Sequence, residues 1–430
     1  MEARENKQKH ILFIAQVFYP EVFRSNDLAA ELVKRGYKVT VLTGIPNYPE
    51  GEFFEGYDCK HNLTEEWNGI TILRIPVVPR GHNSLQLMRN YHSFAASGKK
   101  WVRKHNIDAD LVFTFETSPM SQALIGAWYG KRYRVPVFLY AQDLWPENVI
   151  AVTGIRNRLV VGAINKMVDY IYKWTDEILV TSPSFAEDIV NRKVPVPRKK
   201  VHYWPQYAEE FYRQVDVDEV LEETKTSQYI KTLAETKELK IAFTGNLGMA
   251  QGLDVLPKTA SLLKDYPVKF VIVGDGRYKE TFLGEIKSAR AEDKFILIPR
   301  QQAEKIPDIL ALCDAGFISF APIPLWEHTI PAKLQSYMAC GKTILASAKG
   351  ETERIVREAN CGFTAQTGNP EALADIIKGL FEMEPKERKD YLNTLGENAA
   401  KYFDDHFTKK KLMDELEVKL EQYLAKRTDK

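Results

Sequence analysis

The sequence has little cysteine and no long apolar run. Only four of its 430 residues are cysteines, and no two of them form a C-x-x-C pair. Isolated cysteines among apolar residues pack as small hydrophobic side chains, so we predict a reduced, cytoplasmic protein without disulfides. No apolar run reaches the roughly 20 residues that cross a bilayer, and the polar segment 1–10 contains no signal-peptide core. We therefore expect any membrane contact to be peripheral.

A strong excess of charge is also missing. The formal net charge is +1, although residues 1–205 carry 27 Lys and Arg against 21 Asp and Glu, and residues 206–430 carry 32 against 37. Without a dense basic stripe or a known nucleic-acid motif, we expect no nucleic-acid partner. The basic N-terminal half would favour an anionic substrate or surface. No H-x-x-H motif or cysteine cluster is present, so we predict no metal site and no bound cofactor.

Short apolar runs alternate with amphipathic stretches of helical period along the whole chain. This alternation predicts an α/β fold with parallel sheets. Strands are predicted in the first half at 10–18, 37–44, 70–75, 110–116, 136–143 and 177–182. Strands are predicted in the second half at 239–246, 268–276, 294–300, 315–320, 342–347 and 361–366. The first helix is expected to have Ser25 or Asn26 as its N-cap and to end at Gly36.

The two series of strands predict two doubly wound, Rossmann-like domains, as the length of the chain also favours. A charged segment without strands separates the two series, and we interpret it as a linker with helical surface turns. The predicted segments are the first domain at 1–205, the linker at 206–238, the second domain at 239–385 and C-terminal helices at 386–430, which we expect to pack back on the first domain.

Glycine and polar residues follow three predicted strands of the second half. Open parallel sheets bind ligands at the carboxyl ends of their strands, and glycines there let backbone N–H groups approach a phosphate. The same glycines also occur where a strand and a helix merely pack tightly. These residues are Gly245, Gly248 and Gly252 in "FTGNLGMAQGLDVL", Gly274, Asp275 and Gly276 in "VIVGDG", and Arg300 in "LIPRQ".

Lys333 lies at the start of a predicted helix in "IPAKLQSYMACG". The N-terminus of a helix attracts anions, so a lysine is electrostatically misplaced there unless an anion shares the site. The alternative is a solvated surface lysine, which is what most lysines are.

The strings "GNLGMAQGLDVL", "VIVGDG", "PAKLQSYMACGKTIL" and "CGFTA", in this order, resemble the donor-binding half of GT-B glycosyltransferases of family 4. "GIPNYPEG" and "AQDLWPENV" resemble the bacterial subgroup of WbuB-like amino-sugar transferases of surface polysaccharide assembly. The resemblance covers roughly residues 10–405. It implies two Rossmann-like domains that face each other across a cleft, with a nucleotide sugar in the C-terminal domain and the acceptor in the N-terminal domain. It also implies retention of anomeric configuration without a metal.

The chain departs from this family at the phosphate site. Asn246 and Gln251 stand where many members have arginine and lysine, and His328 and Ser336 stand where they have two glutamates. Lys333 is then the nearest remaining cation for a diphosphate. Donor binding is predicted for Gly245, Asn246, Gly248, Gln251, Gly252, Gly274, Asp275, Gly276, Arg300, Lys333 and Ser336.

Asp143 ends a predicted strand in the half that the resemblance assigns to the acceptor. Its carboxylate is predicted to be catalytic, because it could accept the proton of the acceptor or stabilise a cationic sugar. The alternative is that it caps the following turn. Acceptor binding is predicted for Glu21, Asn47, Tyr48, Glu116 and Glu147.

Segment 84–105 combines six large apolar residues with five Lys and Arg residues. A basic amphipathic helix of this kind can lie in an anionic membrane interface, and more often its apolar face belongs to a domain core.

Together these features predict a retaining glycosyltransferase that uses a nucleotide-sugar donor, with UDP as the expected nucleotide. From the resemblance we expect an N-acetyl amino sugar, an acceptor saccharide on a polyprenyl diphosphate, and a location at the inner face of the cell membrane. Two alternatives stay open: a catalytically silent GT-B binding or scaffold protein, and a nucleotide-sugar 2-epimerase.

Overall fold

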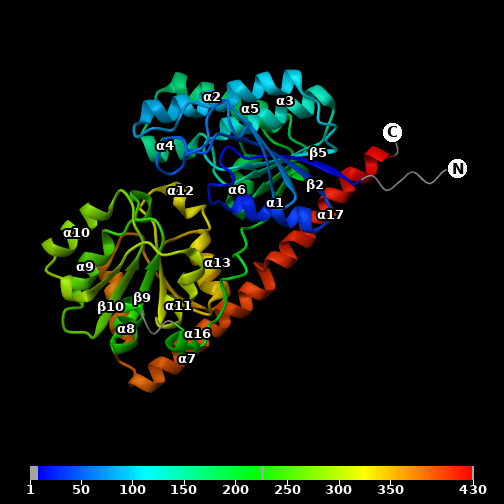
Figure 1. Ribbon diagram of the computed structural model, residues 1–430. Coiled ribbons are helices and arrows are strands. Elements are labelled where there is room, and N and C mark those ends of the chain that lie inside the picture. Colours follow the sequence, from blue (N-terminus) through cyan, green and yellow to red (C-terminus); the bar gives the residue numbers. More distant parts are fainter. Residues whose placement is uncertain (1–7, 224–226, 429–430) are drawn as a thin grey trace. The chain divides into compact units, whose positions relative to one another are not determined.

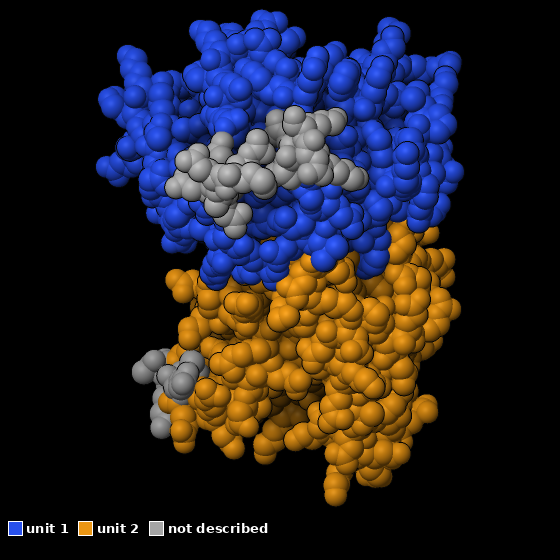
Figure 2. Space-filling model, turned by 90° about the vertical axis from the view of Figure 1, so that its right-hand side faces the viewer, with its two compact units in different colours: residues 1–181, 185–204, 416–430 blue, residues 182–184, 205–415 orange. Residues whose placement is uncertain are grey.

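A computed structural model describes residues 8–223 and 227–428, which form two compact units (Figures 1 and 2). Unit 1 contains residues 8–181, 185–204 and 416–428, and unit 2 contains residues 182–184 and 205–415. Each unit is built on one mainly parallel sheet, which confirms the predicted α/β class.

The sheet of unit 1 has eight strands in the order β3-β4-β2-β1-β5-β6-β7-β8. All neighbours are parallel except β3 and β4. The order reverses between β1 and β5, which makes this the switch point where doubly wound sheets bind ligands. The strands are β1 (His10–Ile14), β2 (Lys38–Gly44), β3 (Thr64–Trp67), β4 (Ile70–Ile75), β5 (Leu111–Glu116), β6 (Val137–Ala141), β7 (Glu177–Val180) and β8 (Val201–Tyr203).

The sheet of unit 2 has six strands, all parallel, in the order β11-β10-β9-β12-β13-β14. Its switch point lies between β9 and β12. The strands are β9 (Leu239–Thr244), β10 (Val268–Val273), β11 (Phe295–Ile298), β12 (Ala315–Ser319), β13 (Thr343–Ser347) and β14 (Gly362–Ala365). Every strand predicted in this half is present.

Helices connect the strands and cover the sheets (Figure 1). Up to residue 204 they are α1 (Arg24–Lys34), α2 (Ser84–Lys104), α3 (Ala123–Tyr133), α4 (Glu147–Thr153), α5 (Arg158–Lys173) and α6 (Pro183–Val190). After it they are α7 (Val217–Glu223), α8 (Gln228–Glu235), α9 (Val255–Leu262), α10 (Lys279–Ser288), α11 (Ile306–Ala311), α12 (Pro324–Glu327), α13 (Ala332–Ala339), α14 (Glu351–Glu358), α15 (Pro370–Leu380), α16 (Pro385–His406) and α17 (Lys409–Thr428).

The start of α1 differs from the prediction. Its N-cap is Phe23, and Ser25 and Asn26 lie inside the helix. Their side chains bind the preceding loop instead, since Oγ of Ser25 donates to the carbonyl of Val17 at 3.3 Å and Nδ2 of Asn26 donates to the carbonyl of Glu21 at 2.7 Å. These tertiary hydrogen bonds replace the local cap.

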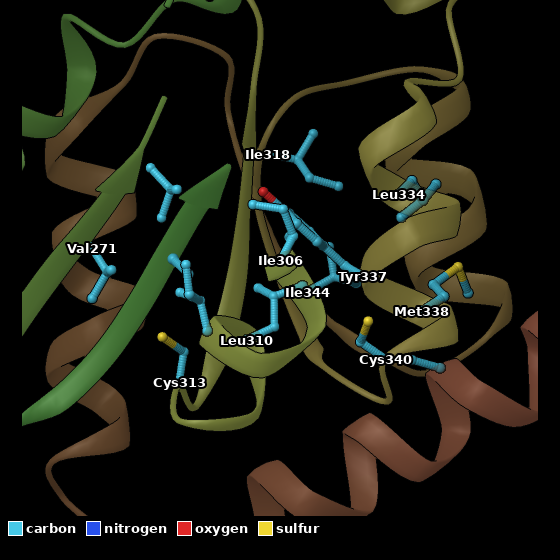
Figure 3. Packing of buried hydrophobic residues seen from close by; sticks show 14 of the residues in the cluster. Val271, Ile306, Leu310, Cys313, Ile318, Leu334, Tyr337, Met338, Cys340 and Ile344 are labelled. Carbon is cyan, nitrogen blue, oxygen red and sulfur yellow. The ribbon is translucent and has the colours of Figure 1, made fainter. Parts of the chain in front are cut away.

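Helices α7 and α8 are not the surface turns that the charged sequence predicted. Val220, Ile230 and Leu233 are buried in the same core cluster as residues of β10, α11 and α13. Figure 3 shows part of this cluster, in which the ring of Tyr337 of α13 extends toward the strands. The apolar faces of α7 and α8 therefore contribute to the core of unit 2.

Helix α17 returns the chain to unit 1. Leu416, Leu420 and Leu424 are fully buried along one side of the helix. The hydroxyl of Tyr37 donates to Glu421 at 2.6 Å, and the hydroxyl of Tyr423 donates to Glu177 at 2.8 Å. Apolar burial and hydrogen bonds together attach the last turns of this helix to the residue before β2 and to β7 of the N-terminal sheet.

Candidate active site

The glycine turns of unit 2 bring the ends of β9 and β10 into close contact. The backbone N–H of Gly245 donates to the carbonyl of Val273 at 2.9 Å. A Cβ at Gly274 would lie 1.9 Å from the carbonyl oxygen of Gly245, and one at Gly252 would lie 2.4 Å from that of Phe320. Glycine is thus required at these positions by the packing of the turns themselves, whether or not a phosphate binds there.

Helix α13 is anchored against the end of β9. The backbone N–H of Thr244, the last residue of β9, donates to the hydroxyl of Tyr337 at 2.8 Å, and Leu334, Tyr337 and Met338 are fully buried. This anchor fixes the first turn of α13, and with it Lys333, beside the glycine turn that follows β9.

Lys333 is not a solvated surface lysine. Its Nζ donates to Oε1 of Gln251 at 2.6 Å and lies 4.8 Å from the centre of the Phe243 ring. A Cβ at Gly245 would lie 3.1 Å from Cε of this lysine. Burial lowers the pKa of the ammonium to about 8, and no carboxylate compensates its charge among the residues that the structure describes. The chain therefore holds a half-buried cation beside an aromatic ring, and a neutral amide is its hydrogen-bond partner.

The other residues predicted to bind the donor lie at the glycine turns and differ in their contacts. Asn246 fits between two glycines, since a Cβ at Gly248 would lie 2.9 Å from its Nδ2 and one at Gly276 would lie 2.7 Å from its Oδ1. Asp275 is exposed and pairs with Lys279 at 2.8 Å, and this ion pair lowers the pKa of Asp275. These residues border the turns without adding a buried charge.

Two further donor candidates have weak positions. Arg300 is exposed after β11, where its charge acts on Asp275. Ser336 is 6% exposed, and its hydroxyl donates to the carbonyl of Ala332 at 3.1 Å. The hydroxyl is thus engaged within α13, which distinguishes it from a glutamate that would extend toward a ligand.

Asp143 follows β6 in unit 1 and is held by Ser118. Its Oδ2 accepts hydrogen bonds from the backbone N–H of Ser118 at 2.7 Å and from the Ser118 hydroxyl at 2.6 Å. Burial raises the pKa of Asp143, and these two donors partly oppose that shift. Asp143 therefore joins two strand ends and does more than cap the turn that follows it.

The sequence did not single out Ser118, although it closely follows the end of β5 in "FETSP". Its hydroxyl also accepts from Nε1 of Trp145 at 3.3 Å and from Nδ2 of Asn148 at 3.2 Å. Ser118 also lines a pocket within unit 1 whose other residues are Gln16, Val17, Gly44, Asn47, Tyr48, Val77, Arg80, Asn90 and Tyr91. Asp143 acts electrostatically on Tyr91, so the carboxylate lies near this pocket.

Glu21 has a different role from the predicted acceptor binding. Its Oε1 accepts from the backbone N–H groups of Asn47 at 2.8 Å and Tyr48 at 2.7 Å, and its Oε2 accepts from that of Phe18 at 3.3 Å. The side chain is 3% exposed, and burial raises its pKa to about 7. Glu21 organises the loop after β2, and its burial leaves little of the carboxylate for an acceptor to contact.

The remaining residues predicted to bind the acceptor differ in their exposure and in their contacts. Nδ2 of Asn47 donates to the carbonyl of Ile45 at 2.6 Å and its Oδ1 accepts from the N–H of Arg80 at 2.9 Å, so this side chain braces its own loop. Tyr48 lines the pocket, with the Arg80 guanidinium 5.2 Å from its ring centre. Glu147 is exposed at the start of α4. Glu116 is completely buried and cannot contact an acceptor directly.

The two units thus offer complementary chemistry. Unit 2 supplies a cation beside backbone turns, which suits a phosphate group, and unit 1 supplies a carboxylate beside a small pocket, and a carboxylate suits a hydroxyl substrate. Within 8–223 and 227–428 no three His, Cys, Asp or Glu side chains are grouped so that they could hold a metal ion.

Comparison with known proteins shows which protein families the two units resemble. Residues 25–206 match the family described as Glycosyltransferase Family 4, and residues 225–402 match the family described as Glycosyl transferases group 1. The chain belongs to glycosyltransferase family 4. The two matches divide this glycosyltransferase close to the boundary between its two sheets.

Two relatives illustrate the similarity of sequence. A putative colanic acid biosynthesis glycosyl transferase of Escherichia coli (strain K12) is 22% identical over 343 residues, which are 76% of this chain and 80% of that protein. An N-acetylgalactosamine-N,N'-diacetylbacillosaminyl-diphospho-undecaprenol 4-alpha-N-acetylgalactosaminyltransferase of Campylobacter jejuni is 24% identical over 307 residues, which are 71% of this chain and 75% of that protein.

Solved structures share the fold. Sucrose-phosphate synthase from Thermosynechococcus elongatus matches with a TM-score of 0.73 at 15% identity and covers 97% of this chain and 100% of its own. Anabaena HepE in complex with UDP and glucose matches with a TM-score of 0.68 at 15% identity and covers 96% of this chain and 100% of its own. These matches confirm the predicted GT-B fold with two Rossmann-like domains.

Proposed function

We propose that this glycosyltransferase transfers a sugar from a UDP-linked donor to a saccharide carried on a polyprenyl diphosphate, in the assembly of bacterial surface polysaccharide. The observation that carries the proposal is the half-buried ammonium of Lys333, whose hydrogen-bond partner beside the turn that follows β9 is a neutral amide. We further propose that the transfer retains anomeric configuration, needs no metal and moves an N-acetyl amino sugar. The protein would then belong to the WbuB-like subgroup.

A diphosphate would satisfy this ammonium better than the chain does. A buried cation loses its hydration, and one neutral amide acceptor replaces only part of it. A phosphate oxygen in the place of the Gln251 amide would add a charge-assisted hydrogen bond, and the positive end of the α13 dipole would favour the same anion. The UDP complex of the HepE structure and the diphosphate-linked acceptor in the name of the C. jejuni relative agree with this choice of substrates.

Thermal unfolding with uridine, UMP and UDP tests the donor assignment. UDP should raise the melting temperature most, because a ligand that binds only the native state stabilises it by mass action. The increase should persist in EDTA if no metal is needed. A protein that no nucleoside diphosphate stabilises, or that UDP stabilises only with a divalent cation, would contradict the proposal.

A silent binding protein is the second candidate, because Ser336 stands where many members have a glutamate and its hydroxyl bonds within α13. Isotope labelling separates the possibilities. A transferase moves labelled sugar to an acceptor, a 2-epimerase exchanges the hydrogen at C2 with solvent, and a binding protein does neither.

Helix α2 gives the proposed membrane contact a location. Its C-terminal half belongs to the core, where Phe94 and Val102 are buried, which agrees with the core alternative for this half. Its first turns are different, because Leu85 and Met88 are 61% and 63% exposed. No described helix is both long and apolar enough to span a bilayer. We propose that these first turns contact the inner face of the cell membrane.

Sedimentation with anionic vesicles tests this contact. Binding should weaken with added salt, because charges on a surface are screened beyond about 10 Å at ~0.1 M ionic strength. Replacing Leu85 and Met88 together by serine should also weaken it. A double variant that binds as well as the wild type would exclude this part of α2.

A further inference from the structure

Glu116 is a buried acid that the proposed donor and acceptor contacts do not explain. It is the last residue of β5, it is opposite Ala141 of β6 in the parallel register, and it is 0% exposed. Within the described part of the chain, neither oxygen of its carboxyl group has a conventional hydrogen-bond donor or acceptor. A polar group buried without partners costs stability, so its presence calls for a reason.

Asp143 is the charged neighbour of this acid. The backbone N–H of Gln142 donates to the carbonyl of Glu116 at 2.9 Å, which ties the two strand ends together, and the two carboxyl groups interact electrostatically. The hydrogen bonds that Oδ2 of Asp143 accepts come from Ser118. Two carboxyl groups in one buried site cannot both ionise at low cost.

The surroundings of Glu116 determine which group holds a proton. Glu116 in turn acts electrostatically on Tyr172 of α5, whose hydroxyl is also buried without a partner among the described residues. The Arg192 guanidinium lies 5.5 Å from the centre of the Tyr172 ring. Nearby backbone N–H groups lower the pKa of Glu116 but do not cancel the effect of burial. No described side chain donates a hydrogen bond to its carboxyl group as Ser118 does to Asp143. Burial therefore raises the pKa of Glu116 well above its usual range, and the proton resides there.

We infer that Glu116 holds the single proton of these two carboxyl groups, so that Asp143 carries the negative charge. The inference rests on the proposed function, in which Asp143 receives the proton of the acceptor hydroxyl. The bond from the anomeric carbon to the diphosphate breaks with its electron pair on UDP, and the acceptor oxygen bonds to that carbon on the face that UDP leaves, so that the configuration is retained. Glu116 keeps its own proton throughout.

The first test compares the pH dependence of stability for the wild type and Glu116→Gln, whose amide mimics the protonated acid. An acid whose pKa is higher in the folded chain binds more protons there, so the wild type should lose stability relative to the variant as the pH rises above about 4.5. The difference in melting temperature, Glu116→Gln minus wild type, should therefore increase steadily up to neutral pH. Glu55→Gln, at an exposed carboxyl, should show no such trend.

The opposite trend, in which this difference decreases with rising pH, would show that Glu116 is ionised in the folded protein and that the fold stabilises its charged form. That result would overturn the inference.

The second test follows the carboxyl carbon of Asp143 by NMR during a pH titration, with the signal assigned by its loss in Asp143→Asn. Glu116→Leu and Glu116→Gln both replace an uncharged acid by an uncharged side chain, so the apparent pKa of Asp143 should change little in either variant. A fall of this pKa in both variants would show that a negative charge had been removed, and it would overturn the inference.

If Glu116→Leu does not fold, the stability comparison with Glu116→Gln decides. Neither measurement uses a substrate. A protein that transfers no sugar would therefore contradict the proposed function and leave the result on Glu116 unaffected.

Discussion

The two units bury ionisable groups of opposite sign at the same end of their sheets. Unit 2 holds Lys333 beside the end of β9, and unit 1 holds Glu116 and Asp143 at the ends of β5 and β6. Burial opposes charge in both, so it lowers the pKa of the ammonium to about 8 and raises the pKa values of the two acids. In each unit, burial thus makes the uncharged form of these side chains easier to populate than it would be in water.

The units differ in how the remaining charge is compensated. Asp143 receives two hydrogen bonds from Ser118 in its own unit, whereas Lys333 has one neutral amide. The carboxylate is therefore prepared before any substrate arrives, and the ammonium gains most of its compensation from an anionic ligand. The contrast predicts a site for chemistry in unit 1 and a site for binding in unit 2.

The largest expected effect concerns Asp143. Asp143→Asn keeps the size of the side chain and an acceptor for Ser118, so the melting temperature should hardly change. Turnover should fall by ~10² to ~10⁴, which is the usual contribution of a positioned acid or base. UDP binding should persist, because the residue belongs to unit 1. Unchanged turnover would mean that Asp143 is only structural, and a large loss of stability would lead to the same conclusion.

A smaller effect is expected for Lys333. Lys333→Gln should weaken UDP binding by about 1.5 to 3 kcal/mol, or roughly 10- to 150-fold, because it removes a hydrogen bond from a charged donor. Uridine should bind almost unchanged. Calorimetric titration with both ligands measures the difference, and an equal loss for uridine would show that the lysine acts on the fold or the base.

A matched control for this variant exchanges the two partners of the 2.6 Å hydrogen bond. The double variant Lys333→Gln with Gln251→Lys keeps one ammonium and one amide in the same contact. It should recover part of the lost UDP affinity. No recovery would show that the position of the cation on α13 matters, and not only its presence beside the turn.

The smallest effect is one of pH. Because the pKa of Lys333 is lowered to about 8, UDP affinity should fall by up to about tenfold per pH unit above that value, as the ammonium loses its proton. The stability of the ligand-free protein should change in the opposite sense. The unfolded chain binds more protons than the folded one between about pH 8 and 10.5, so this group makes folding more favourable as the pH rises there. Lys333→Arg stays charged throughout and should show neither trend.

The positions of most strands along the chain were predictable, because strands of a parallel sheet are buried on both faces and therefore appear as apolar runs. All twelve predicted strands are present, and two more were missed. Strand β3 (Thr64–Trp67) is a polar, half-exposed edge strand that pairs antiparallel, and β8 (Val201–Tyr203) has three residues. Neither carries an apolar run that sequence alone could detect.

The sequence indicated candidate residues but not their contacts. Asp143 stood out at the end of a predicted strand, and Lys333 at the start of a predicted helix. The hydrogen bond from Lys333 to Gln251 spans 82 positions of the chain, and that from Ser118 to Asp143 spans 25. Such pairs depend on how the strands are ordered, and local patterns do not encode them. The loop-organising role of Glu21 was missed for the same reason.

The return of α17 to unit 1 determines how the protein can be dissected genetically. Unit 1 draws on both ends of the sequence, so no single cut in the gene yields it intact. A fragment that stops before Leu416 would uncover the apolar surface under Leu416, Leu420 and Leu424 and would leave Tyr37 without its acceptor. A fragment that begins near residue 205 would carry the same three leucines with nothing to cover them. Circular permutation, which joins the last helix to the first strand, is the route to a free-standing N-terminal half.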